Sequence, residues 1–113
     1  MIANHNQIIK LKKNTDFRLV WSSGKKKVSD NLILMYVENH QQHSRVGISS
    51  VKNYGNAVQR NKITRRIRSI VHMINIKSGK DIVIMARKKS KNTKYSLIHN
   101  ELLNLISISG LSK

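Results

Sequence analysis

The residues best suited to chemistry in this sequence are cations that recur along one short stretch. "GNAVQRNKITRRIRSIV", residues 55–71, carries Arg or Lys at positions 60, 62, 65, 66 and 68 and contains no carboxylate. Guanidinium groups bind phosphate through paired hydrogen bonds. Like charges three or four residues apart on a helix repel one another, at a cost of roughly 0.2–0.5 kcal/mol per pair. The stretch therefore predicts a surface that binds anions.

The other ionisable side chains argue against a self-sufficient catalyst. Five carboxylates are spread singly along the chain, and the five His residues are scattered, with His40 and His43 as the one close pair. A hydrolytic enzyme needs its own acid and base, or carboxylates that together hold metal ions. The absence of Cys excludes disulfides, thiolate zinc sites and cysteine nucleophiles. We expect no catalytic residue and no protein-bound metal, and interpret the His pair as loop residues.

The charge balance indicates a polyanionic partner. The 113 residues include 22 Lys and Arg against 5 Asp and Glu, a formal net charge of +17. This exceeds what solubility requires of a small domain, and the self-repulsion favours a partner of opposite charge. The length fits a single domain over residues 1–113. No segment resembles a signal peptide or is long enough to cross a bilayer, so we expect a cytoplasmic protein.

A helix over residues 57–74 is expected to present these cations. Gly55 suits a turn and Asn56 is a natural N-cap. At 100° per residue, Ile63, Ile67, Ile70, Val71 and Ile74 form one apolar stripe. Opposite this stripe lie Asn61, Lys62, Arg65, Arg68, Ser69 and His72, with Arg66 on the flank.

The remaining pattern predicts an α+β sandwich in which helices pack on one sheet. Asn14 or Thr15 would cap a helix over 14–23, and Ile98, Leu102 and Leu105 mark the core side of the last helix. The other expected elements are strands at 31–37, 45–51 and 81–86, a short strand near 26–29, a basic loop at 87–94, and a helix at 95–108.

Nucleic acid is the favoured partner of the basic helix, and anionic lipid is the competing polyanion. Anionic lipid also binds basic amphipathic helices, but this apolar side is short and lacks aromatics. Duplex DNA in contact with residues 57–74 is the weaker nucleic-acid alternative, because Asn61 is the one amide among the exposed Arg residues. Phe17, Trp21 and Tyr36 would provide a stacking platform for single-stranded bases, against the simpler interpretation that each packs in the core.

The sequence resembles one known family along nearly its whole length. "AVQRNKITRRIR" is similar to the arginine-asparagine-arginine motif helix of the bacterial ribonuclease P protein subunit. "RVGISSVKNYGNAV" resembles the strand and turn that precede that helix. "LKKNTDFRLVWSS" and "DIVIMARKKSKNTKYSLIHNELLNLI" are similar to the opening helix and to the final strand and helix of the family.

The resemblance implies an αβββαβα-like order and a mixed sheet with a left-handed βαβ crossover, a fold also found in the second domain of a small-subunit ribosomal protein. It implies a subunit of ribonuclease P whose partners are the ribonuclease P RNA and precursor tRNA, without a membrane or a small-molecule substrate. Removal of the 5′ leader would be catalysed by the RNA, which would bind most of the Mg²⁺. The residues implied to bind the RNA subunit are Lys52, Arg60, Asn61, Lys62, Arg65, Arg66 and Arg68; those implied to bind the leader are Phe17, Trp21 and Tyr36.

This chain departs from the family pattern at several of these positions. Lys62 replaces the usual second Arg of the motif and keeps its charge without the bidentate fork. Arg66 stands where an apolar residue is common, and Trp21 where Phe is more usual. Thr64 and Asn53 each replace a common Lys. The alternative function is a small basic ribosomal or structural RNA-binding protein without nuclease association.

Overall fold

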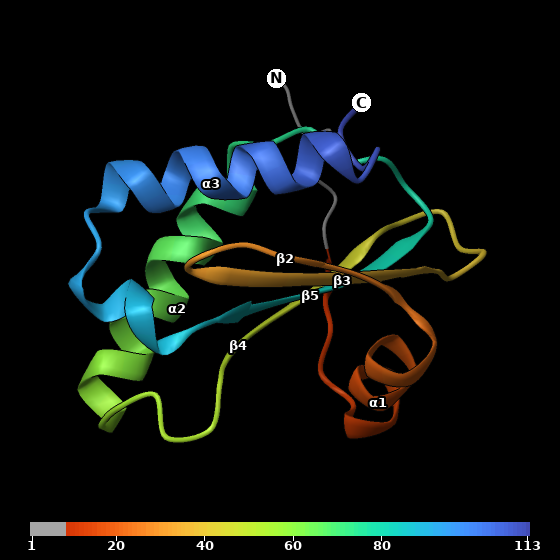
Figure 1. Cartoon of the computed structure of the whole chain (residues 1–113). Helices are drawn as coiled ribbons and strands as arrows, with labels where there is room; N and C mark the ends of the chain where they lie inside the picture. The colour runs from red at the N-terminus through yellow and green to blue at the C-terminus, as the bar shows by residue number, and fades with distance from the viewer. Residues whose placement is uncertain (1–8) are drawn as a thin grey trace.

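The chain folds as a five-stranded mixed sheet with helices on both faces (Figure 1). The computed structural model describes residues 9–113. The elements are β1 (Ile9–Lys10), α1 (Asn14–Ser23), β2 (Lys25–Val28), β3 (Leu32–Glu38), β4 (Arg45–Ser50), α2 (Ala57–His72), β5 (Lys80–Ala86), the 3₁₀ helix η1 (Lys88–Asn92) and α3 (Tyr95–Ile108). The expected α+β class is confirmed, and the expected strands and helices are present within one or two residues of their predicted bounds.

The strand order in the sheet is β1-β4-β5-β3-β2. β1 is parallel to β4 and β4 is parallel to β5, whereas β3 is antiparallel to both β5 and β2. The β4-α2-β5 segment is therefore a βαβ crossover between neighbouring parallel strands, as the resemblance implies. That this crossover is left-handed remains a prediction.

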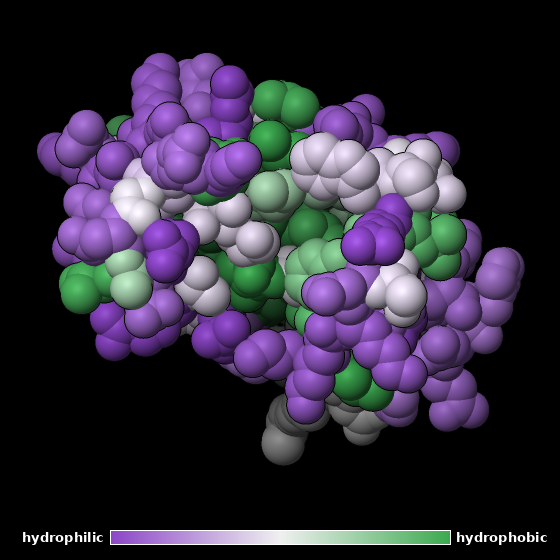
Figure 2. Space-filling view, turned by 90° about the horizontal axis from the view of Figure 1, so that it is seen from below, coloured by the Kyte–Doolittle hydropathy of each residue, from purple (hydrophilic) through white to green (hydrophobic). Residues whose placement is uncertain are grey.

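One face of the sheet is covered by α1 alone. Met35 of β3 and Val83 of β5 are buried there with Val20 of α1 and Leu11. The helix is short, and it leaves part of the sheet uncovered. Figure 2, viewed from this side, shows a hollow with a hydrophobic floor between hydrophilic flanks.

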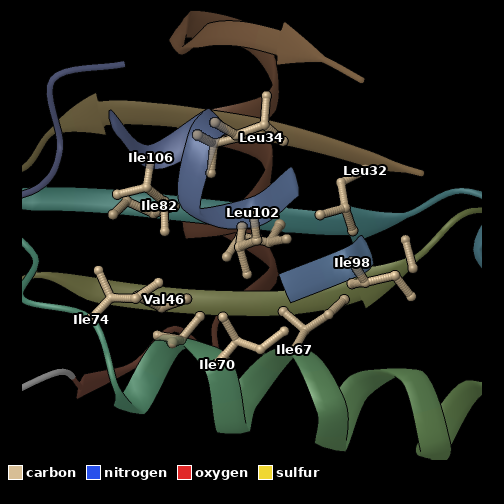
Figure 3. Close-up of a cluster of buried hydrophobic side chains, with 14 of the residues drawn as sticks. Leu32, Leu34, Val46, Ile67, Ile70, Ile74, Ile82, Ile98, Leu102 and Ile106 are labelled. Atoms are coloured by element: carbon tan, nitrogen blue, oxygen red, sulfur yellow. The ribbon is translucent and has the colours of Figure 1, made fainter. Parts of the chain in front are cut away.

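The other face packs against α2 and α3 and forms the larger core (Figure 3). Successive strand residues point to opposite faces, so Leu32 and Leu34 of β3 lie here while Met35 does not. Ile67 of α2 and Leu102 of α3 are fully buried against them. Truncating a side chain such as Ile67 to Ala would cost about 2–5 kcal/mol of stability. This core fixes which side of α2 faces outward.

Local signals identified the N-cap of α2 but not the N-cap of α1. Asn56 caps α2 as predicted. In α1 the N-cap is Lys13, which makes no side-chain cap hydrogen bond, and both Asn14 and Thr15 lie inside the helix. The backbone of Lys13 accepts from the N–H groups of Asp16 and Phe17 instead. Packing on the sheet therefore outweighs capping preference at this end.

Two short elements were not predicted, and one expectation falls outside the described range. β1 consists of two residues paired with β4, and η1 lies within the expected basic loop. Among the described residues, no helix is long and apolar enough to cross a membrane. The predicted absence of a signal peptide concerns residues 1–8, as does His5, and these lie outside the described residues.

Candidate nucleic-acid interface

A complete capping box fixes the start of α2. Asn56 Oδ1 accepts a hydrogen bond from the Gln59 backbone N–H at 2.9 Å, and Gln59 Oε1 accepts from the Asn56 N–H at 3.0 Å. These reciprocal bonds satisfy two N–H groups that have no partner within the helix. A Cβ at Gly55 would lie 2.2 Å from Gln59 Oε1, so any side chain at this position would displace Gln59 from the cap. The turn and cap thereby set where the cations of α2 begin.

The cations of α2 lie on its outer face and on both flanks. Ile63, Ile67 and Ile70 are buried, as the predicted apolar stripe requires. Asn61, Lys62 and Arg65 are exposed, whereas Arg66 and Arg68 are half-buried on opposite flanks of the helix. The helix therefore offers positive charge in three directions.

The carboxylates of the chain are occupied elsewhere. All five lie in the described range, and their partners are Arg45 for Asp16 and Asp81, Lys80 for Glu38, Lys89 for Asp30, and Ser29 with Asn31 for Glu101. Within residues 9–113, no carboxylate pairs with an Arg or Lys of α2. The positive face of α2 is thus not neutralised by this part of the protein.

Two of these pairs also change the ionisation of their members. Hydrogen bonds to Asp81 raise the pKa of Arg45 above its ordinary value, since they stabilise the charged guanidinium. A hydrogen bond from Lys80 lowers the pKa of Glu38 for the same reason. Both pairs lie off α2 and serve the sheet and its connections.

The turn before α2 adds further cations at the same end. Lys52 is exposed, and Asn53 adopts a left-handed conformation with φ 64°, which Asn tolerates better than most residues. Arg60 Nη1 donates to the Gly55 carbonyl at 2.7 Å, so this guanidinium braces the turn. Four of its five N–H donors remain for other partners.

The α1 face holds the hollow seen in Figure 2. A cavity of about 230 Å³ is lined by Phe17, Arg18, Trp21, Ser49, Val83 and Met85. The Phe17 ring is half-buried over Gly47, and Trp21 is 54% exposed. Lys26 Nζ lies 4.6 Å from the centroid of the Trp21 ring, which is within cation–π range. The cavity thus joins two aromatic rings to two nearby cations.

Tyr36 does not join this aromatic surface, and the prediction that it does is wrong. Tyr36 pairs with Ile82 of β5 and packs against the core under α2 and α3. The adjacent β3 position on the α1 face belongs to Met35, which is fully buried. A shift of one residue along a strand moves a side chain to the opposite face. The prediction failed because the sequence did not show which face α1 covers.

Several lining residues were not singled out from the sequence. Arg18 and Ser49 border the cavity and Lys26 contacts Trp21, but none belongs to a local motif. Arg18 lies three residues before Trp21 in α1, and Lys26 lies in the basic segment that follows this helix, but these spacings alone do not single out either residue.

The side chains gathered on these two surfaces are suited to binding nucleic acid. The described residues contain no group of three or more His, Cys, Asp or Glu side chains that could hold a metal ion. Guanidinium and ammonium groups bind phosphates, and exposed aromatic rings stack on bases. The α2 surface suits a folded polyanion, and the aromatic cavity suits an extended single strand.

Comparisons with known proteins agree with this arrangement. The family model described as Ribonuclease P matches residues 6–109. The ribonuclease P protein component of Streptococcus agalactiae serotype III is 35% identical over 105 residues, which cover 90% of this chain and 94% of that protein. The component from Clostridium kluyveri is 37% identical over 111 residues, which cover 94% of this chain and 98% of that protein. The structure of the Staphylococcus aureus RNase P protein is similar with a TM-score of 0.82 at 34% identity, covering 92% of this chain and 97% of that one.

Proposed function

Because this chain belongs to the ribonuclease P protein family, we propose that it works through two surfaces, α2 for the RNA subunit and the aromatic cavity for the substrate. As a family member it is a subunit of the ribonucleoprotein endoribonuclease that processes the 5′ end of tRNA. The alternative of a ribosomal or structural RNA-binding protein is not favoured. Its partners in general are the ribonuclease P RNA and precursor tRNA.

The observation that carries the proposal is the un-neutralised positive face of α2. Arg65 is exposed and Arg68 half-buried, and neither is paired with a carboxylate of the described chain. Phosphates of the RNA subunit would supply the missing negative charge, with Asn61 and Lys62 beside them. Each phosphate neutralised should add roughly 0.7–0.9 to the slope of log affinity against log salt.

The aromatic cavity is proposed to hold the 5′ leader. Phe17 and Trp21 offer ring faces to unpaired bases, while Arg18 and Lys26 lie close enough to meet the backbone of the same strand. Stacking on an aromatic ring contributes about 1–3 kcal/mol per base and tolerates any sequence. A cavity of this kind therefore suits leaders of unrelated sequence.

Hydrolysis itself is assigned to the RNA subunit, which would bind most of the Mg²⁺. The described side chains offer no cluster of ligands for that ion. The protein would instead position the leader and reduce repulsion between substrate and RNA phosphates. We place this activity in the cytoplasm, where precursor tRNA is made.

A reconstitution assay tests the proposal. A bacterial ribonuclease P RNA would be incubated at low Mg²⁺ with precursor tRNA, with and without this protein, and 5′ cleavage would be measured. We expect the protein to stimulate cleavage and to bind the RNA with strong salt dependence. Binding without stimulation would instead favour a structural RNA-binding protein.

A further inference from the structure

We propose that a pocket between α2 and η1 binds one phosphate of the ribonuclease P RNA backbone. This inference deepens the proposed function and rests on it, because it assigns a contact of the RNA-binding surface. The pocket lies on the flank of α2 that faces η1, away from the aromatic cavity. Its lining residues come from both elements and from the turn before α2: Tyr54, Gln59, Lys62, Ile63, Arg66, Ser90 and Lys91.

Three cations converge on the pocket without an acidic neighbour. Lys62 and Arg66 are one helical turn apart on α2, a spacing at which like charges repel. Lys91 reaches the pocket from η1, and its Nζ lies 5.8 Å from the centroid of the Tyr54 ring. No carboxylate lines the pocket. A bound oxyanion would turn this repulsion into attraction.

The base of the pocket supplies hydrogen-bond donors in addition to charge. Tyr54 and Ser90 are 1% and 2% exposed, and their hydroxyl oxygens lie 2.7 Å apart. One hydrogen bond between two hydroxyls uses one of their two protons, and the other can be donated to a ligand. Gln59 Oε1 is committed to the helix cap, so its amide N–H groups are the free end of that side chain.

The size and donor set of the pocket match a phosphate group. Its volume is about 130 Å³, which leaves room for a phosphate group. Arg66 can bind two of these oxygens through its planar fork, whereas Lys62 and Lys91 act as point charges. The lining includes little apolar surface for a base, with Ile63 as its one aliphatic side chain.

The pocket extends the RNA-binding surface beyond the outer face of α2. Arg65 and Asn61 point outward and do not line it. Arg66 and Lys91 are 25 positions apart in sequence and belong to two elements with separate backbone hydrogen bonding. A phosphate held between them would join α2 to η1. The two cations should therefore act as one unit on the RNA.

The test is a double-mutant cycle on RNA affinity. Arg66→Gln and Lys91→Gln remove charge while keeping most of each aliphatic stem, and Lys77→Gln is the matched control beyond the far end of α2. Equilibrium dissociation constants for ribonuclease P RNA would be measured at several salt concentrations for wild type, each single variant and the double variant. Thermal unfolding of each variant would confirm that the fold is kept.

We expect each pocket variant to weaken binding about 5- to 20-fold, and the double variant to weaken it by much less than the product of the two single effects. The salt slope of the double variant should fall by roughly 0.7–0.9, as expected for one lost phosphate. Lys77→Gln should change affinity less than 2-fold, about the size of a single exposed charge.

Two other outcomes separate the pocket from the proposed function. If Arg65→Ala weakens binding while both pocket variants behave like Lys77→Gln, or if their effects multiply independently, the pocket assignment is overturned and the function stands. If wild-type protein shows no salt-dependent binding to the RNA, the proposed function fails and the pocket assignment fails with it.

Discussion

The ring of Phe17 lies directly over Gly47, so that a Cβ at this glycine would come within 2.4 Å of Phe17 Cζ. The ring thus occupies the space that a side chain on β4 would fill. Gly47 is buried, and because it lacks a side chain the Phe17 ring of α1 can pack directly on the backbone of β4. The position of the ring in the aromatic cavity depends on this contact.

We predict that Gly47→Ala moves the Phe17 ring and weakens selection of the leader-bearing substrate. The backbone of β4 is held by neighbours on both sides, so the ring should give way first. The ratio of affinities for precursor and mature tRNA in the reconstituted complex should fall by about 3- to 10-fold, as for partial loss of one stacked base. The measurement is a competition between the two tRNAs.

A Phe17→Ala background provides the control for this effect. Phe17→Ala should itself reduce the preference for precursor tRNA, and adding Gly47→Ala should then change it little. If Gly47→Ala lowers the preference for precursor tRNA by the same factor in the Phe17→Ala background as in wild type, Gly47 acts independently of the Phe17 ring. Unfolding temperatures must accompany both measurements, because Phe17 also packs against Met35 and Val83.

Lys26 and Lys27 offer a matched pair on opposite faces of β2. Lys26 lies over Trp21, whereas the alternation of the strand places Lys27 on the other side. Lys26→Ala should weaken leader binding about 2- to 5-fold, because it removes a cation that lies beside the stacking ring of Trp21 and is proposed to meet the leader backbone. Lys27→Ala removes the same charge and should have a smaller effect; equal effects would mean that charge alone matters.

Replacing Arg65 and Arg68 together by Ala should weaken binding to the RNA subunit without unfolding the domain. Neither side chain is paired with a carboxylate of the described chain, so no buried charge is left behind. The salt slope should fall by roughly 0.7–0.9 for each phosphate lost. Equal affinity of variant and wild type at moderate salt would contradict the assignment of α2 as the RNA surface.

Arg45 should matter for stability rather than for RNA binding. Its Nε and Nη2 donate to Asp81 at 2.8 and 2.5 Å, and its Nη1 donates to Asp16 of α1 at 3.2 Å. Asp81 is 2% exposed, so Arg45→Ala would leave a buried carboxylate without its main partner. We expect the free energy of unfolding, measured by urea denaturation, to fall by about 2–4 kcal/mol.

The exposed pair of Glu38 and Lys80 supplies the comparison for Arg45. Glu38→Gln should change the free energy of unfolding near neutral pH less than Arg45→Ala does, because Glu38 is exposed whereas Asp81 is buried. For the Arg45–Asp81 pair, the double variant Arg45→Ala with Asp81→Asn should lose less free energy of unfolding than the sum of the losses of the two single variants. Simple addition of the single losses would contradict a direct ion pair.

The sequence was most informative where a pattern is local. The spacing of Ile63, Ile67 and Ile70 predicted the inner side of α2, and Asn56 predicted its start. The cations of α2 were therefore expected to face outward, independently of how the rest of the chain folds. Because carboxylates are few, it was also predictable that none within residues 9–113 pairs with an Arg or Lys of α2.

Features that depend on distant segments could not be predicted in this way. Tyr36 was assigned to the aromatic cavity because alternation gives two faces without saying which helix covers each. The contact between Tyr54 and Ser90 joins residues 36 positions apart. Similarly, η1 is anchored where the Arg87 N–H donates to the Asn31 carbonyl at 2.8 Å, a contact between two connections of the sheet.

The position of β2 at the border of the sheet has a consequence for how the protein behaves at high concentration. Within the described residues no strand pairs with its outer side, and a strand of another molecule could add there. Lys25, Lys26 and Lys27 are all exposed along this border, so two approaching copies meet charge of the same sign. These lysines therefore oppose aggregation, and replacing all three with Thr should promote self-association that light scattering would detect.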